Sequence, residues 1–121
     1  TKFMVGHMSL SEFQIKLIEK EVGGLCHKRA PEHVRDQLEY VYKIEKQDVI
    51  IFEVRPLFTD PDKKSQMPFA KMKFIKSRKL WKLYWQRANG SWLQYESPSE
   101  SKDLSTLVKA VDEDQYGCFF G

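Results

Sequence analysis

The sequence predicts a two-layer α+β domain, in which a five-stranded antiparallel meander sheet carries an N-terminal and a C-terminal helix on one face. Three observations predict this fold. Apolar residues recur first at steps of three and four, then alternate through five short runs, then return to steps of three and four. Every connection between the predicted strands is too short for a crossover helix, so neighbouring strands should be antiparallel. Two amphipathic helices can then cover one face of the sheet.

Length and composition indicate one globular domain. The chain has 121 residues, of which 41% are hydrophobic and 13% aromatic, so intrinsic disorder is excluded. No run approaches the roughly 20 apolar residues of a membrane helix, and no signal peptide is recognised. Two cysteines are too few for a disulfide-stapled domain, which favours a reducing compartment and a cytoplasmic location. Residues 1–8 (TKFMVGHM) are typical of a cloning and cleavage remnant, which leaves residues 9–121 as a single α+β domain.

The first helix is predicted over residues 11–28. Ser11 is a good helix cap, and Gln14 stands three residues later, as a capping box requires. Gly23-Gly24 weakens the helix near its end by about 1 kcal/mol per glycine relative to alanine. Pro31 ends it, because the residue before a proline avoids helical geometry. Its apolar stripe consists of Phe13, Leu17, Ile18, Val22, Leu25 and Cys26.

The middle of the chain predicts strands at residues 38–45, 49–54, 69–76, 80–87 and 91–96. Pro56 ends the pairing of the second strand, because proline has no N–H to give the ladder. Residues 59–66 are polar and predict a loop. Asn89-Gly90 predicts a two-residue hairpin turn.

The C-terminal part predicts a helix and a docked tail. Ser101 is expected to cap the helix, whose apolar face consists of Leu104, Leu107, Val108 and Val111. Residues 116–121 (YGCFFG) are apolar and aromatic. Because a free tail of this kind would aggregate, we expect it to dock on the core.

Charge is unevenly distributed along the chain. The formal net charge is +3, but residues 63–95 contain nine Lys or Arg and no Asp or Glu. The segment 96–114 is acidic. A basic middle and an acidic end either serve an anionic partner or neutralise each other in the fold.

The fourth and fifth strands bring aromatic and basic residues together. Alternation places Trp81 and Trp85 on one face and Lys82 and Tyr84 on the other, without deciding which face is exposed. A face that mixes rings and cations suits single-stranded nucleic acid. The alternative is that the tryptophans pack in the core or in a dimer interface. The candidate binding residues are Arg55, Lys71, Lys73, Trp81, Trp85, Arg87 and Trp92.

Arg55 closes the second strand and supports a third hypothesis. A guanidinium at a strand end can clamp a carboxylate or a phosphate through two parallel hydrogen bonds. It can equally pair with Glu53, with Asp60 or with the acidic C-terminal segment inside the protein. A small-ligand or enzyme pocket near Arg55 therefore requires an Arg55 without a carboxylate partner.

Neither catalysis nor metal binding is indicated. The sequence contains no nucleophile elbow, P-loop, dinucleotide fingerprint or zinc-protease motif. The set of Cys26, His27, His33 and Cys118 matches no familiar zinc spacing. We therefore predict no catalytic residue, no metal and no cofactor, and lean toward a protein that is not an enzyme.

Five segments carry a resemblance to a known family. They are Cys26-x-Lys28-Arg29-x-Pro31, Glu53-Val54-Arg55-Pro56, Trp81-Lys82-Leu83-Tyr84-Trp85, Trp92-x-x-Tyr95 and the ending over residues 111–121. With these segments the chain resembles the bacterial family called domain of unknown function 3024 (DUF3024). The resemblance supplies no activity, so it carries over no catalytic residue. It also implies an accessory role on mobile gene cassettes.

The leading hypothesis is a non-enzymatic cytosolic binding or interaction domain that self-associates through the sheet or the C-terminal tail. The first alternative is single-stranded nucleic-acid binding through residues 63–95, and the second is a ligand or enzyme pocket near Arg55. No membrane partner is expected.

Overall fold

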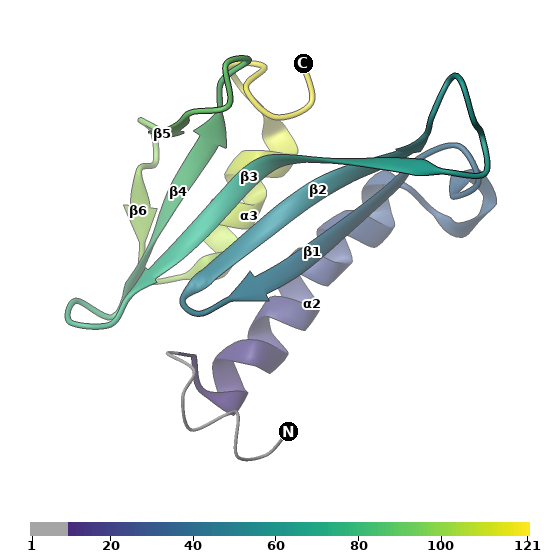
Figure 1. Ribbon diagram of the computed structural model, residues 1–121. Helices are drawn as coiled ribbons and strands as arrows, with labels where there is room; N and C mark the ends of the chain where they lie inside the picture. The colour runs from purple at the N-terminus through teal and green to yellow at the C-terminus, as the bar shows by residue number, and fades with distance from the viewer. Residues whose placement is uncertain (1–9) are drawn as a thin grey trace.

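The computed structural model describes residues 10–121, and the expectation that residues 1–8 are a cloning remnant lies outside the described residues. Figure 1 shows a twisted sheet with helices behind it. The elements are α2 (Glu12–Arg29), the short 3-10 helix η1 (Glu32–Val34), β1 (Glu39–Glu45), β2 (Asp48–Pro56), β3 (Lys64–Ile75), β4 (Leu80–Gln86), β5 (Trp92–Gln94), β6 (Glu100–Ser101) and α3 (Leu104–Glu113).

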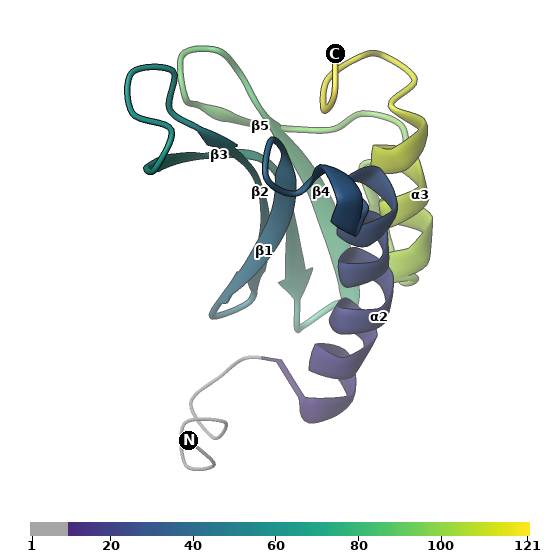
Figure 2. The ribbon, with the colours of Figure 1, turned by 90° about the vertical axis from the view of Figure 1, so that its right-hand side faces the viewer.

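The predicted fold is confirmed. The sheet is antiparallel in the order β1-β2-β3-β4-β5, and β6 pairs with β4 on the edge that β5 also occupies. Figure 2 shows α2 and α3 side by side on one side of the sheet, with no helix on the other. Across residues 10–121, neither helix combines the length and the apolar character that crossing a bilayer would require.

Helix α2 forms as its sequence predicts. The Ser11 side chain accepts from the Gln14 amide at 3.1 Å, and the Gln14 side chain accepts from the Ser11 amide at 2.9 Å, which completes the capping box. The helix runs through Gly23-Gly24 and ends at Arg29, just before Pro31. Its buried side, which includes Ile18 and Val22, rests on the sheet and on α3.

The core lies between the two layers. Val49, Ile51, Met72 and Leu83 point from the sheet toward the helices, and all four are almost completely buried. Leu104, Leu107 and Val111 face them from α3. The alternation of the strands therefore matches the helical stripes, so that one apolar set from each layer is removed from water.

The prediction of a loop over residues 59–66 was wrong at its end, because β3 begins at Lys64. Strand β2 continues through Pro56, which pairs with Lys64 at the end of the ladder, where a missing N–H costs little. The pairing then shifts between Ile51 and Phe52, so that Phe52 lies opposite Pro68. This irregularity accommodates a proline inside β3.

Strand β5 is shorter than the predicted 91–96. The chain leaves the sheet at Tyr95, which is only 3% exposed, and turns through a cis Ser97-Pro98 peptide before β6. The prediction that Ser101 caps the last helix was also wrong. Asp103 is the N-cap, and the Ser101 hydroxyl accepts from the Asp103 amide at 3.0 Å.

The C-terminal tail docks on the core, as predicted. Asp114 ends α3 in the left-handed conformation, with φ of 47°. Its carboxylate accepts from the Phe119 amide at 2.9 Å and from the Phe120 amide at 2.8 Å. Phe119 is buried, and the Phe120 ring packs against the rings of Tyr40 and Phe69.

A second contact fixes the tail to α2. Lys28 Nζ lies 2.6 Å and Arg29 Nε 3.1 Å from the two carboxylate oxygens of Asp112. Arg29 also donates to the Asp112 carbonyl, and its guanidinium lies 3.8 Å from the centre of the Phe120 ring. The residues of two segments that carry the family resemblance are therefore in contact with each other.

Candidate functional site

The face of the sheet turned away from the helices, here called the open face, is a surface on which several predicted site residues meet. Cross-strand pairs share a face, so the register assigns its side chains. They include Lys43, Glu45, Asp48, Ile50, Phe52, Lys71, Lys73, Lys82, Tyr84, Gln86, Trp92, Gln94 and Glu100. In Figure 2 this face is on the left.

Two cross-strand rows of the open face differ in charge. The outer row runs Asp48, Lys73, Lys82, Glu100 across four strands, so bases and acids compensate each other. Lys73 Nζ lies 3.4 Å from Asp48 Oδ1, and Glu100 binds the Arg78 guanidinium at 2.9 Å. Positive charge in this row is therefore largely taken up inside the protein.

The inner row has no acid. It runs Lys43, Ile50, Lys71, Tyr84, Gln94 across β1 to β5. With the neighbouring Phe52 and Trp92 it forms what we call the lysine–aromatic patch: Lys43, Phe52, Lys71, Tyr84 and Trp92. An electropositive strip with rings is therefore present at the middle of the sheet.

Within the lysine–aromatic patch, each ammonium lies against rings. Lys71 Nζ is 5.0 Å from the centre of the Tyr84 ring and 4.8 Å from that of Trp92. Lys43 Nζ is 4.8 Å from the Phe52 ring and donates to Gln66 Oε1 at 2.9 Å. Cation–π contacts at accessible sites are worth about 0.5–1 kcal/mol each. An anionic group that binds a lysine ammonium more strongly than the ring does can therefore displace the ammonium from the ring.

The structure separates the predicted tryptophans. Trp81 is 2% exposed and packs on Phe74 with 5.0 Å between ring centres, on the helix side. Trp85 shares that side and packs against the core. Trp92 lies on the open face with Lys71. Of the predicted site residues, the open face thus brings together Lys71, Lys73 and Trp92.

Arg87 and Arg55 lie elsewhere. Arg87 follows β4 in the turn to β5 and lines a cavity of about 450 Å³ at the point where β3 and β4 separate. Arg55 pairs with Glu53 at 3.3 Å, and this hydrogen bond raises the pKa of the guanidinium. The pocket hypothesis requires an Arg55 without a carboxylate partner, and this ion pair counts against it.

The cysteines and histidines do not assemble. Among the described residues no group of three or more His, Cys, Asp or Glu could hold a metal ion. Cys26 is buried on the inner side of α2, and this burial raises the pKa of its thiol to about 11. His27 Nδ1 lies 2.6 Å from the Arg35 guanidinium, on the surface.

The predicted site residues omit three members of the lysine–aromatic patch, Lys43, Phe52 and Tyr84. Tyr84 was assigned to one face of the fourth strand but was not named as a binding residue. Phe52 lies in a nearly continuous apolar run, which gives no alternation to read. Lys43 was assigned only to the polar side of the first strand. The missing signal is the register between β1 and β2, which is a property of the folded sheet and not of either strand alone.

One protein family matches residues 10–121, under the description Domain of unknown function (DUF3024). This range contains every helix and strand described above. No curated protein and no solved structure matches the sequence.

Proposed function

The chain belongs to the DUF3024 family, whose description assigns no activity, and on that premise we propose that it is a non-enzymatic binding domain that holds single-stranded nucleic acid on its open face. The observation that carries the proposal is the lysine–aromatic patch, in which Lys43 and Lys71 lie among three rings with no acid in their row. Rings offer stacking surfaces to bases, and ammonium groups hold phosphates.

Single strands fit this face better than a duplex. The three rings of the patch are half-buried and spread over β2, β4 and β5, so they form a shallow surface that unpaired bases can lie on. Bases inside a duplex present only their edges in the grooves. Lys71, between Tyr84 and Trp92, is placed where a backbone phosphate would lie beside two stacked bases.

Self-association through the same face is less well supported. In a symmetric dimer each surface meets its own copy, so Lys43 and Lys71 would face the lysines of the second chain. Lysine is also depleted in protein interfaces in general. The exposed Leu93 and Tyr116, beside a cavity of about 480 Å³ between β5 and the tail, are the better dimer surface. Sedimentation at micromolar concentration tests this: a single 14.3 kDa species excludes a dimer.

A cytoplasmic location belongs to the same proposal. Both cysteines, Cys26 and Cys118, are free thiols, as is usual in a reducing compartment. A bacterial source and an accessory role on a mobile gene cassette are proposed on the family resemblance alone.

Fluorescence anisotropy with a labelled single-stranded oligonucleotide tests the proposal. We expect binding at about 50 mM salt that weakens steeply as salt rises, because counterions are released from the phosphates. Trp92→Ala should weaken binding about tenfold, since one stacked base is worth about 1–3 kcal/mol. Lys71→Ala removes a contact to a phosphate, so it should weaken binding by a similar factor and reduce the salt dependence. Lys109→Ala, on the exposed side of α3, is the matched control and should bind normally.

The proposal is abandoned if no binding occurs at about 50 mM salt. It is also abandoned if the Trp92 and Lys71 variants, shown by circular dichroism to be folded, bind as tightly as the parent. If the protein prefers a duplex to a single strand of equal length, binding is electrostatic and does not depend on stacked bases, which contradicts the proposal.

A further inference from the structure

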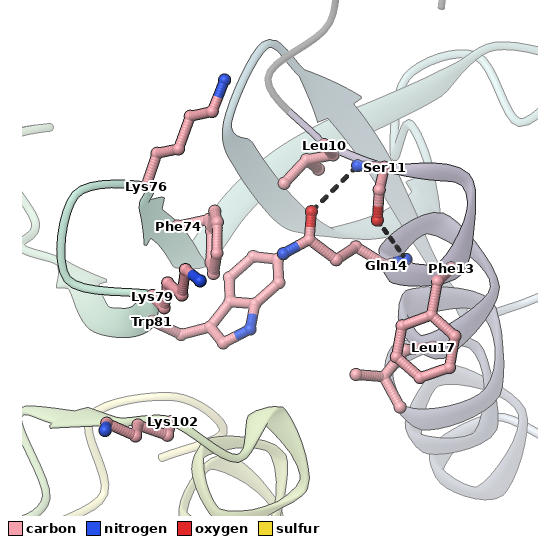
Figure 3. A pocket seen from close by; sticks show the side chains of 10 residues that line it. All are labelled: Leu10, Ser11, Phe13, Gln14, Leu17, Phe74, Lys76, Lys79, Trp81 and Lys102. Atoms are coloured by element: carbon pink, nitrogen blue, oxygen red, sulfur yellow. Dashed lines mark hydrogen bonds between the residues drawn. The ribbon is translucent and has the colours of Figure 1, made fainter.

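A groove of about 600 Å³ opens on the helix side of the molecule, away from the open face (Figure 3). It lies between the first turns of α2, the hairpin end of β3 and β4, and the segment just before α3. Its apolar lining includes Phe13, Leu17, Phe74 and Trp81. Phe13 is 75% exposed, so the groove presents an apolar wall to solvent.

Three lysines surround this apolar lining. Lys76 and Lys79 come from the β3–β4 hairpin, and Lys102 from the chain before α3. None of the three forms an ion pair within residues 10–121, and no acidic residue lines the groove. The sequence of residues 1–9 contains no Asp or Glu either. The groove therefore combines an apolar surface with positive charge that the described protein leaves uncompensated.

The indole N–H of Trp81 supplies an independent sign of a ligand. The Trp81 side chain is 98% buried, yet none of the hydrogen bonds among residues 10–121 involves its Nε1. Among the described residues, Nε1 is not one of the fully enclosed side-chain atoms that lack a partner. Figure 3 shows the nitrogen directed toward the open space on the side of Leu17. A donor in such surroundings gains when an acceptor reaches it.

We propose that this groove binds a small amphipathic anion, with an alkyl or aromatic body and one carboxylate or phosphate group. The apolar body lies along Phe13, Leu17 and Phe74. The anionic group accepts a hydrogen bond from Trp81 Nε1, and the lysines that line the groove, among them Lys79 and Lys102, attract it by their positive charge. Removal of the apolar body from water favours binding, and the charged hydrogen bond adds selectivity for anions.

The test uses the indole N–H signals of the full chain in ¹⁵N NMR spectra. The three tryptophan signals are assigned with Trp85→Phe and Trp92→Phe, which leave the groove intact. Titration with decanoate and with decyl phosphate should shift the Trp81 signal saturably, below about 1 mM ligand. Whichever of the two shifts it at lower concentration identifies the preferred anionic group. Decylamine, with the same body and opposite charge, should leave the signal in place.

Variants separate charge from folding. Lys79→Ala with Lys102→Ala should weaken binding of the anion about tenfold, while Lys109→Ala, on α3 outside the groove, should not. The proposal is overturned if Trp81 does not respond to either anion, if decylamine shifts it equally, or if the double lysine variant binds as tightly as the parent. Because the groove and the lysine–aromatic patch share no residue, Lys71→Ala should leave this titration unchanged, and failure of one proposal leaves the other standing.

Discussion

Asp112 shows how single residues join the two ends of the domain. The Asp112 carboxylate forms ion pairs with Lys28 and Arg29 of α2. The Asp112 side chain is 25% exposed, whereas the Lys28 side chain is 69% exposed. The sequence places it in an acidic run that looks like a solvated helix end. What the sequence could not show is that the basic end of α2 lies beside it, because the two are 84 positions apart.

The Asp112 ion pair predicts a pH dependence of stability. The hydrogen bond from Lys28 lowers the pKa of this carboxyl from its ordinary value of 3.8. A lowered pKa means that the carboxylate stabilises the fold above about pH 4, and that this contribution is lost as pH falls through the folded-state pKa. Because the pair is partly exposed, it is worth about 0.5–1 kcal/mol.

Urea unfolding at a series of pH values measures the contribution of the Asp112 ion pair to stability. Asp112→Asn should be less stable than the parent at neutral pH and should lose less stability on acidification. Glu113→Gln, at the exposed neighbouring position, serves as the control and should follow the parent curve. Parallel curves for parent and Asp112→Asn between pH 7 and about pH 3 would show that the pair does not contribute.

At the scale of elements, local signals decided where helices start and strands end. The capping box placed the start of α2 correctly, because Ser11 and Gln14 interact within one turn. Ser101 misled for the same physical reason: serine, like Asp103, favours a cap, and only the pairing of β6 with β4 selects between them. Strand β6 has two residues and no periodicity, so no sequence pattern could reveal it.

The choice of face could not be predicted either. Trp81 and Trp85 on one side of β4, and Leu80 and Tyr84 on the other, are similarly apolar sets. The helices and Phe119 settle the choice through contacts from distant parts of the chain. Alternation therefore predicted which side chains share a face, and the tertiary packing determined which of those faces remains open.

Replacing a glycine by alanine should have opposite effects on stability in a helix and in a turn. Gly24 lies inside α2, and a Cβ there would meet nothing within 4 Å. Gly24→Ala should therefore stabilise the protein by about 0.5–1 kcal/mol. Gly90 has φ of 89° in the β4–β5 turn, so Gly90→Ala should destabilise it by about 1 kcal/mol.

The midpoint of urea unfolding reports the change in stability caused by each substitution, provided that the dependence of the unfolding free energy on urea concentration is unchanged. The two positions are compared directly because each gives the new methyl group free space. Equal shifts of the same sign would show that backbone conformation is not the deciding factor.

At the scale of the molecule, the C-terminal tail completes the core. Phe119 is 8% exposed and packs on Tyr95 with ring centres 5.1 Å apart. Asp114 holds the amides of Phe119 and Phe120, so the tail is fixed by its backbone as well as by its rings. The sequence predicted docking from composition, but not the carboxylate that anchors it.

Removal of the Phe119 ring should show how much the tail contributes. Phe119→Ala should destabilise the protein by about 3–5 kcal/mol, since it leaves a cavity in a close-packed core. Tyr116→Ala, three residues earlier and 61% exposed, should cost less than about 0.5 kcal/mol. Urea or thermal unfolding of the two variants checks the contrast. Similar, small losses for both would mean that the tail is not part of the cooperative unit.

The two proposed ligand surfaces lie on opposite layers of one domain. The lysine–aromatic patch uses the uncovered side of the sheet, and the groove uses the end of the helix layer near the β3–β4 hairpin. The basic segment 63–95 supplies residues to both, because neighbouring positions in a strand point to opposite sides. The positive charge of this segment is thus divided between two surfaces, because Lys71 lies on the open face whereas Lys76 and Lys79 lie in the β3–β4 turn beside the groove.

The separation of β3 from β4 has a practical consequence. Strand β3 pairs with β4 only from Ala70 onward, and β2 pairs with β1 only up to Val54, so the end of β2 and the start of β3 project as a hairpin beyond both neighbours (Figure 1). Its tip closes through the Leu57 amide and the Lys63 carbonyl at 2.8 Å, with Phe58 fully exposed. A foreign peptide or a fluorophore could be grafted between Pro61 and Asp62 and displayed there, held clear of the folded body that carries it.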